Sequence, residues 1–186
     1  IVTAMPTSWN ILWDPQFKDK YTLANFYEYD NYITAVALGF PPDKMFDYKT
    51  VNTPEFQEKL AQLASNAHAL WEGVDKPEDY QGMVLVAGWG LAFPALKAQG
   101  ARWKMAELQE GMPGYVTVFT LSHTLEKNPK LKQIAEEWLN YILSDELQAS
   151  DIRDNAAWPV TTTVKKVLTP EEIADFHLED PTYLEK

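Results

Sequence analysis

The sequence of 186 residues contains no cysteine and no long apolar run. Without cysteine, the chain has no disulfide framework, no thiolate zinc site and no cysteine nucleophile. Its longest mostly apolar stretch, residues 83–96, is interrupted by Gly88, Gly90 and Pro94. A membrane span requires about 18 uninterrupted apolar residues. We therefore expect no membrane-spanning helix.

Basic residues and histidines are scarce. Lys and Arg number 16 against 27 Asp and Glu, and the formal net charge is −11. Such a field repels phosphate backbones, so we expect no nucleic-acid partner. The 3 histidines are scattered, no HxxxH, GxSxG or P-loop motif is present, and adjacent acidic pairs point to different parts of a helix surface. We expect no metal, no cofactor and no enzymatic activity.

Apolar periodicity and turn residues predict alternating strands and helices. Strands are expected over residues 21–25, 83–87 and 115–120. Seven helices are expected. Four lie within 6–15, in the segment that ends at Gly39, from Thr53 through Trp71, and around Pro94. The other three lie from Asn128 to Leu143, over 147–152, and after the capping box at Thr169. Residues 41–52 are expected to form a loop. This order predicts an α/β protein with a mainly parallel sheet flanked by helices.

Two predicted strand-to-helix turns carry candidate ligand-binding residues, because open α/β sheets bind ligands outside the carboxyl ends of their strands. The loop after the first strand presents Tyr27, Glu28, Tyr29 and Asp30, and the next turn presents Trp89 between two glycines. Carboxylates among aromatic rings suit an organic cation, since they pair with its ammonium group while the rings attract it. Alternatively, these aromatic residues cover a sheet edge or a surface between lobes.

Four segments match the motifs of one known family. They are PTSWNILWDPQFKDK at 6–20, ALGF at 37–40, MVLVAGWGLAF at 83–93 and NPKLKQIAEEWLNYILSDELQ at 128–148. In sequence and order they resemble the extracytoplasmic solute-binding proteins of ABC importers, especially the spermidine/putrescine-binding group. The resemblance implies two α/β lobes of the periplasmic-binding-protein type that close on a small solute without catalysis. It also implies a periplasmic or membrane-anchored extracytoplasmic location and ABC permease subunits as partners.

The resemblance also implies a domain organisation. Residues 1–120 correspond to the second, ligand-binding lobe, and residues 121–186 to C-terminal helical segments at and beyond the hinge. A first lobe is expected upstream of Ile1. Because a lobe without its counterpart exposes aromatic residues, we also expect that the chain can associate as a homodimer.

Individual site residues carry over from the resemblance only in part. Glu28 and Asp30 stand near the positions that contact ammonium groups in polyamine binders, and Trp89 or Gly88 near a strand-end tryptophan. Tyr115 takes the place of a later aromatic residue, but the aspartate that accompanies it has no counterpart at 116–118. This loss argues against spermidine or putrescine and favours a different or less charged ligand. A carbohydrate-active hydrolase with a carboxylate pair and a ligand-sensing domain of the same fold stay open as alternatives.

Overall fold

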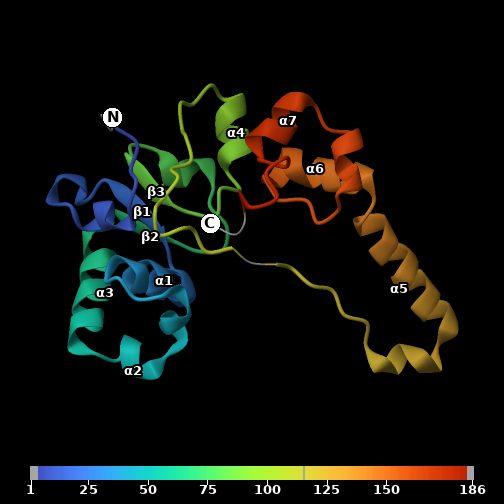
Figure 1. Ribbon diagram of the computed structural model, residues 1–186, viewed down its shortest axis with the longest axis horizontal. Helices are drawn as coiled ribbons and strands as arrows, with labels where there is room; N and C mark the ends of the chain where they lie inside the picture. Colours follow the sequence, from blue (N-terminus) through green and yellow to red (C-terminus); the bar gives the residue numbers. More distant parts are fainter. Residues whose placement is uncertain (1–3, 115, 184–186) are drawn as a thin grey trace. The chain divides into compact units, whose positions relative to one another are not determined.

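The computed structural model describes residues 4–114 and 116–183 and divides the chain into two compact units (Figure 1). We call Ile1–Pro113 the N-terminal unit and Gly114–Lys186 the C-terminal unit. Among the described residues, no helix has the length and apolar character needed to cross a membrane. The N-terminal unit contains the sheet, and therefore the strand ends at which the candidate site was predicted.

A three-stranded parallel sheet forms the centre of the N-terminal unit, which confirms the predicted α/β fold. The central strand β1 (Tyr21–Ala24) pairs with β2 (Ala69–Trp71) on one side and with β3 (Leu85–Ala87) on the other. Every residue of β1 is buried. Burial on both faces is typical of a parallel strand that is covered by other elements on each side.

Helices and short turns surround this sheet (Figure 1). The α-helices of the N-terminal unit are α1 (Tyr27–Ala37), α2 (Tyr48–Val51), α3 (Pro54–Asn66) and α4 (Phe93–Ala98). Its 3₁₀ helices are η1 (Trp9–Trp13), η2 (Pro15–Phe17), η3 (Pro42–Phe46) and η4 (Pro77–Tyr80). The segment expected to be a loop over residues 41–52 thus contains η3 and α2.

The two faces of β1 contact different elements, because successive side chains of a strand point to opposite faces. The Tyr21 hydroxyl donates to the Leu63 carbonyl oxygen of α3 at 2.6 Å. On the opposite face, the Thr22 hydroxyl donates to the Asp79 carbonyl oxygen of η4 at 3.0 Å. Both hydroxyls are removed from water, so each bond satisfies a group whose isolation would be costly. Together they hold α3 and η4 on the central strand.

The helix predicted from Thr53 through Trp71 starts as expected but ends earlier. Thr53 accepts a hydrogen bond from the Phe56 backbone N–H, and Pro54 occupies the first turn. The helix ends at Asn66, after which the His68 N–H donates to the Tyr21 carbonyl oxygen at 2.7 Å. The prediction for the last residues was therefore wrong, because pairing with β1 extends Ala69–Trp71 into β2.

The C-terminal unit is helical throughout its regular elements. It contains η5 (His123–Lys127), α5 (Pro129–Ile142), α6 (Asp145–Asn155), η6 (Thr163–Lys166) and α7 (Pro170–Asp175). The predicted helices from Asn128, over 147–152 and after Thr169 are confirmed. A small core of Ala149, Ile152 and Val164 joins α6 to η6, whereas no residue of α5 is buried against the rest of the described chain.

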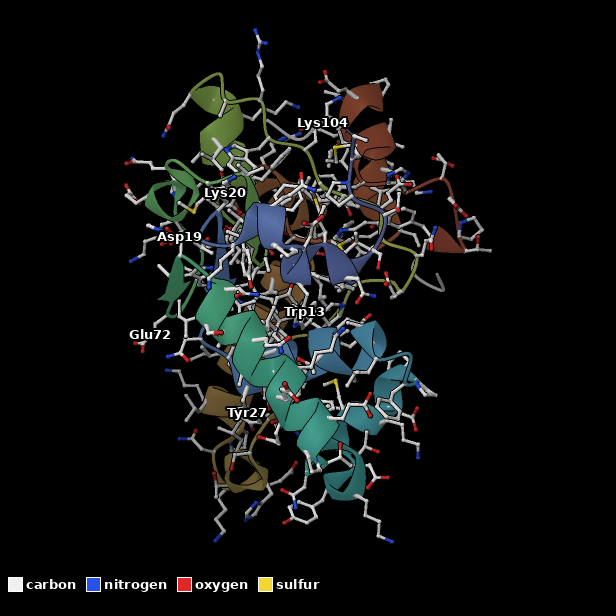
Figure 2. All side chains as sticks on the ribbon, turned by 90° about the vertical axis from the view of Figure 1, so that its left-hand side faces the viewer. Trp13, Asp19, Lys20, Tyr27, Glu72 and Lys104 are labelled. Carbon is white, nitrogen blue, oxygen red and sulfur yellow. The ribbon has the colours of Figure 1, made fainter. Side chains whose placement is uncertain are left out.

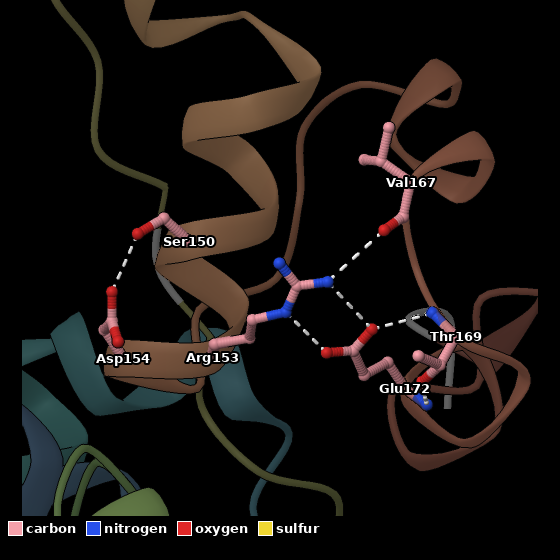
Figure 3. A network of polar contacts seen from close by, with 6 residues as sticks. All are labelled: Ser150, Arg153, Asp154, Val167, Thr169 and Glu172. Atoms are coloured by element: carbon pink, nitrogen blue, oxygen red, sulfur yellow. Dashed lines mark hydrogen bonds and ion pairs between the residues drawn. The ribbon is translucent and has the colours of Figure 1, made fainter.

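An ion pair links α6 to α7 (Figure 3). The Arg153 Nε donates to Glu172 Oε1 at 2.6 Å, and its Nη2 donates to Oε2 at 3.2 Å. Glu172 also accepts the Thr169 backbone N–H at 2.7 Å and so completes the predicted capping box. These donors, the Arg153 guanidinium first, lower the pKa of Glu172 to about 2. The pair fixes the start of α7 against α6.

The strand predicted over residues 115–120 is not formed by the described residues 116–120. Val116 and Val118 are exposed, and no other strand pairs with this segment in the described parts of the chain. A single β-prone segment leaves its backbone hydrogen bonds to water and gains no packing, so composition alone does not make it a strand. Tyr115 itself lies outside the described residues.

Candidate functional site

The carboxyl ends of the three strands meet at one end of the sheet, which we call the carboxyl edge. Asn25 and Phe26 follow β1, Glu72 follows β2, and Trp89 follows β3. The Asn25 side-chain amide donates to Glu72 Oε1 at 3.1 Å and ties two of these strand ends together. In Figure 2, Tyr27 and Glu72 lie below Asp19 and Lys20, the two residues that precede β1.

Residues 27–30 form the first turn of α1 instead of the predicted loop. Phe26 is the N-cap residue, with extended backbone angles of φ −143° and ψ 104° and no side-chain cap. Glu28 and Asp30 lie in the first turn, where negative charge interacts favourably with the helix dipole. Adjacent side chains of a helix point in different directions, whereas residues three positions apart, such as Tyr27 and Asp30, lie on the same side of it.

Tyr27 and Tyr29 consequently have different environments. The Tyr27 side chain is 70% exposed, whereas Tyr29 is only 6% exposed. The Tyr29 ring packs edge-on against Trp9 at 6.0 Å between centroids and lies 5.2 Å from the Trp89 ring. Tyr29 is thus part of the core beneath the carboxyl edge, while Tyr27 is available to a partner in solution.

Trp89 belongs to a continuous aromatic cluster, which we define as Phe26, Tyr27, Tyr29 and Trp89. The Phe26 ring lies 5.7 Å from Trp89 and 6.0 Å from Tyr27, distances typical of interacting aromatic pairs. The structure therefore brings Trp89, Tyr27 and Tyr29 together as predicted candidates, and Phe26 connects them. Phe26 was not among the predicted site residues, although its position directly after a predicted strand was a usable signal.

The carboxylates at the start of α1 are only partly exposed. Asp30 Oδ1 is buried and has no hydrogen-bond partner among the described residues. Burial raises the pKa of Asp30 from its ordinary value of 3.8 to about 7. The nearby Glu28 carboxylate raises the pKa of Tyr27 above its ordinary value. An ammonium group that paired with Asp30 would offset the cost of its burial and lower its pKa again.

A further carboxylate at this edge, Asp75, is 3% exposed and was not predicted. It accepts hydrogen bonds from the Tyr80 hydroxyl at 2.7 Å and from the backbone N–H groups of Trp89 and Ala92, both at 3.1 Å. The pKa of Tyr80 is raised, first by its burial and then by this contact with Asp75. Asp75 thus contacts the turn that carries Trp89.

Two other predictions concern Tyr115 and the absence of a metal site. Tyr115, the last predicted site residue, is outside the described residues, so its part in the site stays a prediction. Within residues 4–114 and 116–183, no group of three or more histidine or acidic side chains could hold a metal ion.

Comparison with known proteins identifies a family for this chain. A family model described as bacterial extracellular solute-binding protein matches residues 2–182 of the chain. The match extends over both compact units. No curated protein and no solved structure matches the chain.

Proposed function

The chain belongs to the bacterial extracellular solute-binding proteins, and we propose that its carboxyl edge binds a small organic cation, a polyamine or a related amine. Family membership makes it the solute-binding component of an ABC transporter, located in the periplasm or elsewhere outside the cytoplasm. Its partners are then a small-molecule solute and the permease subunits. Proteins of this family generally bind solutes without converting them.

The cation preference rests on the aromatic cluster and the carboxylates that share the carboxyl edge. Phe26 and Tyr27 are exposed aromatic rings, and Glu28 and Asp30 lie in the same helical turn as Tyr27. A cation over an aromatic ring gains about 0.5 to 2 kcal/mol, and a charge-assisted hydrogen bond to a carboxylate adds to this. A neutral sugar would gain neither the cation–π attraction nor the ion pair.

The charge of the proposed solute follows from the number of available carboxylates. Residues 116–118 contain no acidic side chain, so an ammonium group placed near them would lose its water without gaining an anionic partner. Such a loss costs several kcal/mol. We therefore propose an amine with one or two positive charges in preference to spermidine.

In this proposal the carboxyl edge is one wall of a cleft between two lobes, with residues 1–120 as the second lobe. Closure of such a cleft requires contacts that exist only in the closed state. Tyr27, which is 70% exposed, has free ring surface for such a contact. Residues 121–186 are then the segments at and beyond the hinge.

Isothermal titration calorimetry of the full protein tests the proposal. Putrescine, spermidine and thiamine represent cations, and glucose and glutamate represent neutral and acidic solutes. We expect at least one cation to bind. The double variant Trp89→Ala with Glu28→Gln should weaken its binding about tenfold or more, since each lost contact is worth about 1 kcal/mol.

The matched control combines Trp138→Ala with Asp43→Asn, which remove an exposed tryptophan of the C-terminal unit and an exposed carboxylate of η3. Binding should be unchanged in this variant. Wild-type affinity in the Trp89 and Glu28 double variant, or binding of glucose alone, would contradict the proposal. Light scattering of the same samples tests the predicted homodimer, and conversion of a bound solute would instead favour an enzyme.

A further inference from the structure

Asp75 is a buried acidic residue in a polar segment between β2 and β3. Its side chain forms no ion pair with a described basic residue, and its hydrogen-bond donors are one hydroxyl and two backbone N–H groups. We propose that Asp75, supported by Tyr80, is a positioning residue that holds Trp89 where it meets the solute. This inference rests on the proposed function, because it assigns a role within the same site.

The two backbone donors lie on either side of the turn between β3 and α4. Asp75 Oδ1 accepts from the Trp89 N–H, and Oδ2 accepts from the N–H of Ala92, the N-cap residue of α4. An ionised carboxylate can only accept, so it fits two converging N–H groups, whereas an amide side chain would direct one of its own donors at them. One side chain thereby fixes both ends of the turn that carries Trp89.

Asp75 is itself held by the sheet through η4. The Tyr80 hydroxyl donates to Asp75 Oδ2 at 2.7 Å, and the neighbouring residue Asp79 accepts the Thr22 hydroxyl of β1 at its carbonyl oxygen. The Tyr80 ring also meets Trp103 edge-on at 5.0 Å. A continuous set of contacts therefore runs from the central strand to the backbone of Trp89.

The turn has little space to adjust. A Cβ at Gly88 would lie 3.3 Å from Asp75 Cγ and 3.4 Å from Trp71 Cζ2, so only glycine fits there without movement. Gly90 has φ +82°, a conformation that favours glycine. With its backbone held by Asp75 and its ring packed on Tyr29, Trp89 has a defined position before any solute arrives. Preorganisation of this kind improves affinity, because less motion is lost on binding.

The test uses the full protein labelled with 5-fluorotryptophan, so that each tryptophan contributes a ¹⁹F signal. Trp89→Phe identifies the Trp89 signal. We expect Asp75→Asn and Tyr80→Phe to shift and broaden that signal while the signals of Trp13, Trp138 and Trp158 stay in place. Asp43→Asn, which removes an exposed carboxylate, should change none of them.

Affinity is measured in parallel by calorimetry with putrescine, spermidine and thiamine. Asp75→Asn should weaken cation binding about tenfold or more, since hydrogen bonds to a charged group are lost, and Tyr80→Phe should weaken it less. If Asp75→Asn fails to fold, Tyr80→Phe decides the question, because it removes only a hydroxyl.

The outcomes separate the two proposals. An unchanged Trp89 signal in the folded variants overturns the positioning role, as does a changed signal with unchanged cation affinity. A changed signal in a protein that binds none of the three cations supports the structural coupling but refutes the proposed function. Movement of all tryptophan signals together would show a general structural role and would also overturn the proposal.

Discussion

Replacing Asp30 with asparagine is expected to stabilise the protein above pH 7 and to have little effect near pH 4. Asp30 lies in the first turn of α1 with one carboxylate oxygen buried and unpaired among the described residues, and burial raises its pKa to about 7. The unfolded chain releases this proton near pH 4. Between pH 4 and pH 7 the folded state therefore binds more protons, and stability falls as the pH rises through this window.

The size of the effect follows from the shift in the pKa of Asp30. A change in pKa from 3.8 to about 7 corresponds to a loss of about 4 kcal/mol of folding stability on ionisation of Asp30, if the shift is converted in full. Asp30 is only partly buried, so solvent screening reduces the cost to about 1 to 2 kcal/mol. The helix dipole favours the charged form by about 0.3 to 1 kcal/mol, which lowers the expected gain further but does not reverse it. We expect Asp30→Asn to gain about 1 kcal/mol at pH 8.

Urea unfolding followed by tryptophan fluorescence at pH 4, 5, 6, 7 and 8 measures this difference. The free energy of unfolding of the variant minus that of the wild type should be near zero at pH 4, rise as the pH increases toward 7, and level off above pH 7. Asp43→Asn is the control, because Asp43 is an exposed carboxylate, and its difference should stay near zero at every pH. A difference for Asp30→Asn that is constant with pH, or that falls as the pH rises, would refute the reasoning.

Two further predictions concern the same edge of the sheet. If a cation pairs with Asp30, the affinity of the protein for that cation should fall by up to about tenfold for each pH unit below 7 and level off above pH 7. Calorimetry over pH 5.5 to 8.5 should show this slope. A flat profile would exclude the pairing. Gly88→Ala should destabilise the protein by about 1 to 3 kcal/mol and weaken cation binding, because its Cβ would lie 3.3 Å from Asp75 Cγ. Gly114→Ala, where nothing lies within 4 Å of the added Cβ, is the matched control, and equal unfolding midpoints in the two variants would count against the tight turn.

Helix starts could be read from the sequence because their signals are local. Thr53 followed by Pro54, Asn128 followed by Pro129, and the Thr169 capping box each contain both the cap and the first turn within a few residues. The start of α1 lacked this signal. Its N-cap is Phe26, which makes no side-chain hydrogen bond to the helix, so residues 27–30 resembled a loop.

Elements that depend on distant partners were harder to predict. Leu70 and Trp71 continue the apolar spacing of α3, and only pairing with β1 shows that they belong to a strand. The reverse case is the segment 116–120, where β-branched and aromatic residues favour a strand but no described strand lies beside them. In both cases the pairing partner, which the local sequence does not contain, decides the structure.

The candidate site shows the same division between local and distant information. Trp89 could be found from the sequence, because an aromatic residue between two glycines at the end of an apolar strand is a local pattern. Asp75 could not, since it stands in the polar run GVDKPEDYQG, whose acidic residues all suggest a solvated loop.

Only the fold distinguishes Asp75 from its acidic neighbours, because the turn at Trp89, 14 positions later in the sequence, lies against its side chain and supplies two backbone donors. A carboxylate buried without such donors would cost several kcal/mol, so its burial and its contacts with the turn depend on each other. Trp89, which presents the aromatic ring, can therefore be predicted from the sequence, whereas Asp75, which fixes its position, can be found only from the fold.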